Sequence, residues 1–178
     1  MIKKILVFFV SVFFVSIFTS SLSQAVDLKA NEKAVSDEYK KLIPADKIKN
    51  IDDLYKKWME VQEGKSKALI LDIRTEAEFD SGHILGSNNI DSGHAYGIPE
   101  KITDPNTEIW VFCRTKNRSI YFVANLYKYG YTNVFLVEGG IKEWAEKGYP
   151  LVSKHLGEIK VVKYDKSLKE NYMIRENK

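Results

Sequence analysis

Apolar residues occur along the chain in two patterns, and the first is the pattern of an amphipathic helix. Three segments carry apolar side chains at i, i+3 and i+4, the stripe of an amphipathic helix. They are residues 51–59, 120–127 and 141–147. Asn50 can cap the first helix, and Gly64 lies just beyond its end. Gly130 and Gly148 follow the other two, so the pattern predicts three helices after residue 50.

The second pattern is a short, nearly continuous run of apolar residues, which is typical of a strand covered on both faces. Such runs lie at residues 68–73, 109–112 and 133–137. Residues 96–108 contain two prolines and are expected to be mostly loop. Because strands alternate with helices, we predict an α/β fold in which a parallel sheet carries helices on both faces.

Both ends of the chain differ from this central pattern. Residues 27–44 are polar, with one helical stretch at residues 35–43, and we expect a peripheral arm there. The tail from Lys154 onward is charged, and residues 159–164 are a candidate extra strand. Neither end has the apolar content of a second domain.

The first residues have the three parts of a secretory signal. Lys3 and Lys4 precede an apolar run at residues 5–18, and small residues follow as far as Ala25. A bilayer span takes about 20 residues, so an uncleaved N-terminal anchor is the weaker alternative. No cysteine lies directly after the run, which excludes a lipid-anchored lipoprotein. We therefore predict a periplasmic or secreted protein with no membrane attachment after cleavage. Its predicted parts are a signal peptide (1–25), a polar arm (26–47), one domain (48–152) and a charged tail (153–178).

The charge balance gives no support for binding to nucleic acid. Removing Lys3 and Lys4 from the 27 basic residues leaves 25 against 24 acidic ones, so the net charge falls from +3 to +1. A nearly neutral chain with interspersed charges lacks the basic surface that such binding requires.

Cys113 is the one cysteine in the chain, so an internal disulfide is impossible. Exported proteins usually pair their cysteines. An unpaired one indicates a reactive thiol or an intermolecular bridge, unless it is buried as a small hydrophobic residue. The neighbouring residues must distinguish these alternatives.

Cys113 lies where the strand at residues 109–112 ends and a helix is about to begin, the edge at which parallel sheets place their ligand sites. Unpaired backbone N–H groups and the helix dipole favour negative charge there. Arg114, Lys116 and Arg118 add three cations. Each of these features stabilises the thiolate over the thiol, so we expect a nucleophile beside an anion site.

Five ordered motifs over about residues 48–152 resemble the rhodanese-like domain family. They are LDIRTEAEF (71–79), GHILGS (82–87), CRTKNRS (113–119), GYTNV (130–134) and EGGIKEW (138–144). The resemblance implies a five-stranded parallel sheet with helices on both faces. It also implies a sulfurtransferase that needs no metal or organic cofactor.

In that family's reaction, the Cys113 thiolate would attack the outer sulfur of a small anionic donor such as thiosulfate. A persulfide would form and then pass its sulfur to cyanide, a thiol or a protein acceptor. Asp72 and Arg74 would support the loop, although a structural ion pair is the simpler interpretation. The donor-binding residues would be Arg114, Thr115, Lys116, Asn117, Arg118 and Ser119.

The length of the loop distinguishes sulfur transfer from the main alternative activity, which is that of a phosphatase. Dual-specificity phosphatases of a related fold have the spacing Cys-x5-Arg, whereas Arg118 gives Cys-x4-Arg and Ser119 occupies the phosphatase arginine position. Phe112 replaces the histidine usual before a phosphatase cysteine.

Lys116 stands where many family loops have glycine, which predicts a strained backbone if that position is left-handed. A non-catalytic sulfur carrier that docks a partner is the alternative function.

Overall fold

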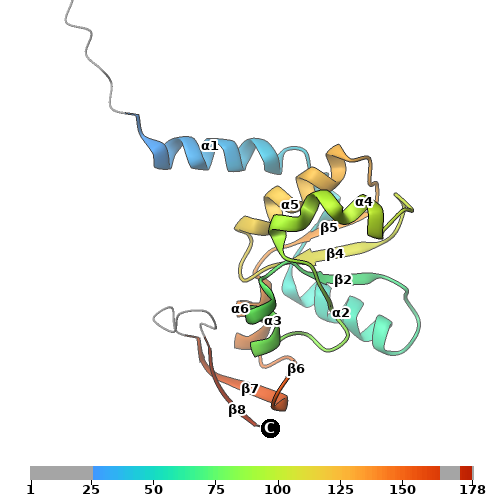
Figure 1. Ribbon diagram of the computed structural model, residues 1–178, viewed down its shortest axis with the longest axis vertical. Coiled ribbons are helices and arrows are strands. Elements are labelled where there is room, and N and C mark those ends of the chain that lie inside the picture. The colour runs from blue at the N-terminus through green and yellow to red at the C-terminus, as the bar shows by residue number, and fades with distance from the viewer. Residues whose placement is uncertain (1–25, 165–172, 178) are drawn as a thin grey trace, which may run out of the picture.

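The computed structural model describes residues 26–164 and 173–177, and the predicted signal peptide lies outside them. Five parallel strands form the central sheet in the order β1-β5-β4-β2-β3 (Figure 1). They are β1 (Ile48–Lys49), β2 (Leu69–Asp72), β3 (Asn88–Asn89), β4 (Ile109–Phe112) and β5 (Val134–Val137). The predicted α/β fold with a five-stranded parallel sheet is confirmed.

The helices cover both faces of the sheet, as predicted (Figure 1). They are α1 (Leu28–Lys40), α2 (Ile51–Gln62), α3 (Glu76–Ser81), α4 (Ile98–Lys101), α5 (Asn117–Lys128) and α6 (Gly140–Glu146), with 3-10 turns η1 (Ala45–Lys47) and η2 (Ser92–Gly97). Asn50 caps α2 through a capping box with Asp53. The expectation of mostly loop at residues 96–108 is wrong at its start, where η2 ends and α4 lies.

Two apolar cores lie on opposite faces of the sheet. Along β4, Ile109 and Val111 join the core beneath α4 and α5, while Trp110 and Phe112 join the core beneath α2 and α6. All four are buried. A strand whose successive side chains enter two cores has no polar face, which explains the continuous apolar run in the sequence.

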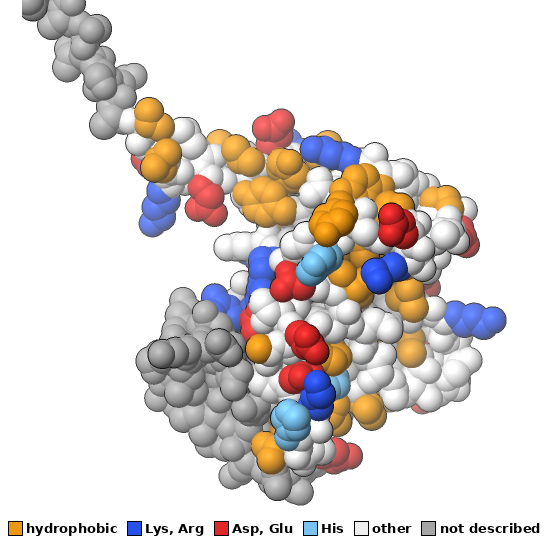
Figure 2. Space-filling model, viewed as in Figure 1, with side chains coloured by type: hydrophobic (Ala, Val, Ile, Leu, Met, Phe, Trp, Pro, Cys, Tyr) orange, Lys and Arg blue, Asp and Glu red, His pale blue; other side chains and the backbone are white. Residues whose placement is uncertain are grey.

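The N-terminal arm is a longer helix than the sequence predicted. Asp27 accepts hydrogen bonds from the backbone N–H groups of Lys29 and Ala30, and α1 therefore begins well before residue 35. Its first turns project from the domain, and its last turns pack on α5 (Figure 1). The Tyr39 and Tyr121 ring centroids are 5.0 Å apart there. Apolar side chains lie along α1 and over this junction (Figure 2).

The C-terminal segment forms a second sheet, in which β6 (Leu151–Ser153), β7 (Gly157–Tyr164) and β8 (Met173–Asn177) are antiparallel. The candidate strand at residues 159–164 lies within β7. Leu151 and Ile159 are buried in the core beneath α2 and α6, so this sheet packs on the domain. The predicted boundary between the domain and the charged tail, after residue 152, therefore falls inside β6. Among the described residues, no helix combines the length and apolar character that crossing a bilayer requires.

Candidate active site

Cys113 follows β4 directly, at the carboxyl edge of the central sheet. Its side chain continues the alternation of β4 and packs in the core beneath α5, with 1% of the residue exposed. The thiol therefore lies under the loop that leads into α5. Burial of this degree is also typical of a structural cysteine, so the groups around the loop distinguish the two roles.

The loop after Cys113 presents hydrogen-bond donors that none of the described residues uses. The backbone N–H groups of residues 115–119 donate no hydrogen bond to any residue that the structure describes. Ser119, fully buried in the first turn of α5, has a hydroxyl that likewise lacks a partner among the described residues. Buried polar groups are normally paired. Such a set of N–H groups at a helix start is suited to an anion.

Glu78 of α3 holds Arg118 in a bidentate ion pair. Nη1 and Nη2 of Arg118 lie 2.8 and 2.9 Å from the two carboxylate oxygens. These hydrogen bonds raise the pKa of Arg118 above its ordinary value despite burial, and the negative charge of Glu78 adds to the effect. Burial disfavours the charged form of Glu78, but the bonds and charge of Arg118 outweigh it and lower its pKa.

The positive charge around the loop is smaller than the sequence indicated. In the sequence, Arg114, Lys116 and Arg118 stand close together with no acidic residue among them. In the fold, Glu78 neutralises Arg118, and Glu138 lies 3.9 Å from the Lys116 ammonium. Two of the three cations therefore lie near carboxylates, and both carboxylates come from segments distant in the sequence.

Asp72 and Arg74 form the expected buried ion pair, with Nη2 of Arg74 at 2.6 Å from a carboxylate oxygen of Asp72. Arg74 also donates to the backbone carbonyls of Glu78 (3.0 Å) and Gly82 (2.8 Å), which lie on both sides of the end of α3. The pair does not contact residues 113–119 through any of these bonds. It holds α3 in place, and α3 presents Glu78 to Arg118.

His83 makes structural contacts with Phe79 of α3. Its Nδ1–H donates to the Phe79 carbonyl (2.9 Å), and its ring stacks on Phe79 with centroids 3.8 Å apart. Burial lowers the pKa of His83 below its ordinary value, although the bond to Phe79 opposes this.

The start of α6 supports the loop from the other side. The backbone N–H groups of Ile141 and Lys142 donate to the carbonyls of Cys113 (2.9 Å) and Arg114 (3.1 Å). Gly140 allows this approach because its φ is +61°, and a Cβ there would lie 2.4 Å from the Cys113 carbonyl oxygen. The sequence showed the Gly139-Gly140 motif but not its role in supporting the loop.

Lys116 does not have the backbone conformation that its replacement of glycine suggested. Its φ is −153° and its ψ is −24°, and it is the residue before the first turn of α5. Because φ is negative, lysine fits this position without the cost of a left-handed conformation. The expected strain is absent at this residue.

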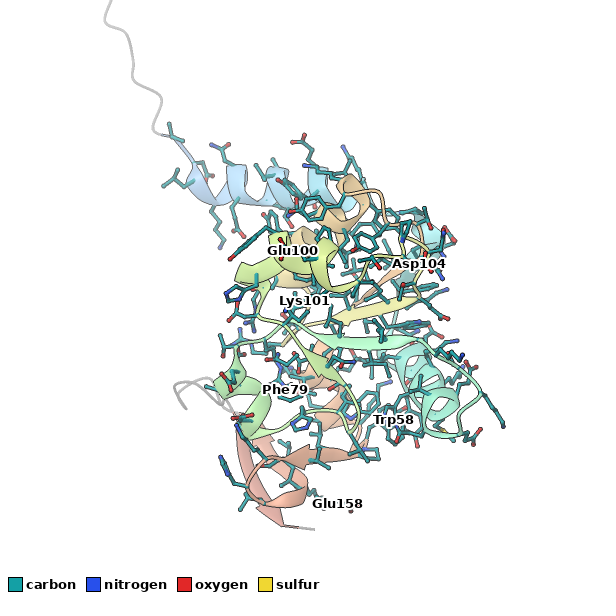
Figure 3. The ribbon with its side chains drawn as sticks, turned by 45° about the vertical axis from the view of Figure 1, so that its right-hand side comes forward. Trp58, Phe79, Glu100, Lys101, Asp104 and Glu158 are labelled. Atoms are coloured by element: carbon teal, nitrogen blue, oxygen red, sulfur yellow. The ribbon has the colours of Figure 1, made fainter. Side chains whose placement is uncertain are left out.

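The carboxyl edge of the sheet is hollowed on both sides of the loop. A cavity of about 340 Å³ is lined by Thr115, Lys116, Asn117 and the start of α6. Another of about 260 Å³ lies between Arg118 and η2. A larger one of about 800 Å³ lies beyond η2, where Figure 3 shows Phe79 on one side and Glu100 and Lys101 on the other. Of the predicted donor-binding residues, Thr115, Lys116 and Asn117 line the first cavity and Arg118 lines the second. Cys113 and Ser119 are buried.

Comparison with known proteins agrees with this geometry. Residues 52–147, more than half of the chain, match the family model of the rhodanese-like domain. The thiosulfate sulfurtransferase GlpE of Pseudomonas putida is 31% identical over 80 residues, which cover 45% of this chain and 72% of that protein.

Two solved structures share the fold. The rhodanese-like domain of the Anabaena protein Alr3790 aligns with a TM-score of 0.53 and 20% identity, covering 60% of this chain and 79% of the other. RPA3614 of Rhodopseudomonas palustris, a protein of unknown function named a possible tyrosine phosphatase, has a TM-score of 0.51 and 26% identity, covering 67% and 92%. The motifs, the sheet order and the family match together show that this chain belongs to the rhodanese-like domain family.

Proposed function

We propose that the protein is a thiosulfate sulfurtransferase in which Cys113 carries the transferred sulfur. The Cys113 thiolate attacks the outer sulfur of thiosulfate, the S–S bond of the donor breaks, and sulfite leaves with the bonding electron pair. The product is a Cys113 persulfide. Cyanide or a thiolate then attacks the terminal sulfur, and the electron pair of the broken S–S bond returns to Cys113 as a thiolate.

One observation carries this proposal: the set of unused donors around the cysteine. The N–H groups of residues 115–119 and the buried Ser119 hydroxyl can donate to an anion without breaking any hydrogen bond between described residues. Donors fixed in advance stabilise developing negative charge most effectively, because they need not reorganise during the reaction. The persulfide and the departing sulfite are both anions. The name of the P. putida relative supports thiosulfate as the donor.

The proposal is tested with purified protein, thiosulfate and cyanide. Thiocyanate should form, and intact mass measured after thiosulfate alone should rise by one sulfur atom. Cys113→Ser should abolish both signals, while Tyr129→Phe, an exposed residue at the end of α5, should keep both. Thiocyanate formation by Cys113→Ser would overturn the assignment.

A sulfur carrier that docks a partner is the second candidate, and the burial of Cys113 favours it. A sulfur buried beneath the loop is well protected once loaded, as a carrier requires. Both functions give the same mass gain. The enzyme discharges its sulfur rapidly to cyanide or a small thiol, whereas the carrier keeps it until a protein acceptor is added. Single-turnover measurement of persulfide loss separates the two.

A phosphatase is a third candidate because RPA3614 carries that description. The spacing of Cys113 and Arg118 gives a loop one residue shorter than the phosphatase pattern, which leaves less room for a tetrahedral phosphoryl group. Hydrolysis of p-nitrophenyl phosphate that depends on Cys113 would favour this activity over sulfur transfer.

We also propose that the protein acts after export. The basic and apolar sequence of residues 1–25 supports this. Expression of the full chain in a bacterial host, followed by fractionation and intact mass, tests it. A mature protein beginning at Val26 in the exported fraction is expected, and a full-length protein retained in the cytoplasm would contradict export.

A further inference from the structure

Two features that the family resemblance leaves unexplained meet at one carboxylate. The first is α1, which lies outside the residues that match the family model. The second is Lys116, in the loop after Cys113. Nζ of Lys40, at the end of α1, lies 2.9 Å from Oε1 of Glu138. Nζ of Lys116 lies 3.9 Å from the same oxygen.

The two distances differ in kind. A separation of 2.9 Å is a charge-assisted hydrogen bond, whereas 3.9 Å is too long for one. Lys40 therefore holds the Glu138 carboxylate. The Lys116 side chain has 54% of its surface exposed, so its ammonium group faces solvent at the cavity lined by the loop.

Packing fixes Lys40 in this position. Its neighbour Tyr39 lies against Tyr121 of α5, and the Lys128 ammonium is 4.4 Å from the Tyr39 ring centre. Ile43, just after α1, is buried in the core beneath α5. Glu138 is also held, because its backbone N–H donates to the Lys49 carbonyl (2.9 Å). The bond from Lys40 to Glu138 thus joins two anchored segments.

We propose that Lys40 is a positioning residue that sets the charge at the mouth of the active-site loop. By neutralising Glu138, it leaves the Lys116 ammonium available to attract an anionic sulfur donor. Without Lys40, the nearest cation to Glu138 is Lys116, which would turn away from the mouth to pair with it. This inference rests on the proposed function, since it assigns α1 a part in selecting anionic donors.

The charge effect can be measured without sulfur transfer. Iodoacetate and iodoacetamide alkylate a thiol by the same displacement of iodide and are similar in size, but only iodoacetate is an anion. The ratio of their rates at Cys113 reports the charge that an approaching anion meets. At low ionic strength we expect Lys40→Ala to lower this ratio about threefold, since the charges are partly exposed to solvent. Salt should remove the difference.

Five further proteins isolate the cause. Lys40→Arg should keep the wild-type ratio, and Lys40→Ala with Glu138→Gln should restore it because the competing carboxylate is gone. In a Lys116→Ala background, Lys40→Ala should lower the ratio less than it does in the wild-type background, because no Lys116 ammonium remains to pair with Glu138. Lys33→Ala is the matched control, because Lys33 lies on the same helix and pairs with Asp37 instead. A change caused only by loss of structure would alter both reagents equally and would not be restored by Glu138→Gln.

The outcomes separate the two proposals. With thiosulfate, Lys40→Ala should raise KM about threefold and leave kcat unchanged. If Cys113 is alkylated but Lys40→Ala leaves the ratio unchanged, the role of Lys40 is overturned and the sulfurtransferase proposal stands. If the ratio falls as expected but no thiocyanate forms, the sulfurtransferase proposal fails, and the role of Lys40 in setting the charge at the mouth of the loop stands. A thiol that reacts with neither reagent overturns both.

Discussion

Replacing Glu78 with glutamine should destabilise the protein in a way that depends on pH. The substitution keeps the size of the side chain but removes the charge that binds Arg118 at 2.8 and 2.9 Å. The Glu78 side chain is 10% exposed, and that of Arg118 is 34% exposed. Hydrogen bonds to charged groups contribute about 1.5–3 kcal/mol each, against about 1 kcal/mol for neutral ones. Discounting for the exposure of Arg118, we expect a loss of about 1–2 kcal/mol in the free energy of unfolding at pH 7.

The sign of the pH dependence follows from the pKa of Glu78. The balance of burial against the bonds from Arg118 leaves this pKa in the folded protein below its ordinary value of 4.5. The ionised carboxylate therefore stabilises the fold above the unfolded-state pKa, and this contribution is lost as pH falls through the folded-state pKa. Wild type and Glu78→Gln should differ most at neutral pH and converge in acid.

Urea unfolding at a series of pH values tests this, with Glu76→Gln as the control on the same helix. Glu76 is exposed in the first turn of α3, and no ion pair joins it to another described residue. Its substitution should change the unfolding free energy by less than about 0.5 kcal/mol. Equal stability of wild type and Glu78→Gln at pH 7 would refute the role of the pair. So would a difference that persists unchanged below the folded-state pKa.

Three other substitutions have defined expectations. Gly140→Ala should cost about 2–4 kcal/mol in urea unfolding, because φ is positive and the added Cβ meets the Cys113 carbonyl; stability equal to wild type would contradict the close approach. Ser119→Ala should change stability by less than about 0.5 kcal/mol, since the hydroxyl has no partner among the described residues, yet slow sulfur loading about tenfold by mass spectrometry. Unchanged loading would remove Ser119 from the site. Asp72→Asn should cost about 3–5 kcal/mol, since it leaves the Arg74 charge buried without its partner; a cost near zero, measured by urea unfolding, would show that Arg74 finds another acceptor.

The central fold was predictable because its strongest signals are local. The apolar run at residues 109–112 reflects a strand that is buried on both faces, and the stripe at residues 120–127 reflects a helix that is buried on one face. Both elements lie where the pattern predicted them. β1 and β3 were not predicted. Each is two residues long, and Asn88–Asn89 has no apolar side chain. Their pairing with β5 and β2 depends on tertiary contact, which single-sequence patterns do not contain.

The site was predictable only where its groups are neighbours in the chain. Cys113, the loop and the start of α5 are contiguous, so their proximity could be inferred. Glu78 is 40 residues from Arg118 in sequence, and its partnership appears only when α3 is placed. Glu78 could have been noticed through the Thr75–Glu78 capping box, although that pattern predicts a helix start and no ion pair.

These distant contacts change the physical account of how an anion would be bound. The sequence suggested attraction by three cations, but two of them lie within reach of carboxylates from other segments. Attraction at long range is therefore weaker than the sequence implied. The unused N–H groups and the Ser119 hydroxyl remain, and they act at hydrogen-bonding distance on whatever occupies the loop. Binding by fixed donors favours an anion that fits the loop over one that is merely highly charged. A site of that kind discriminates by shape, and the few exposed cations, Lys116 among them, then govern how fast an anion arrives.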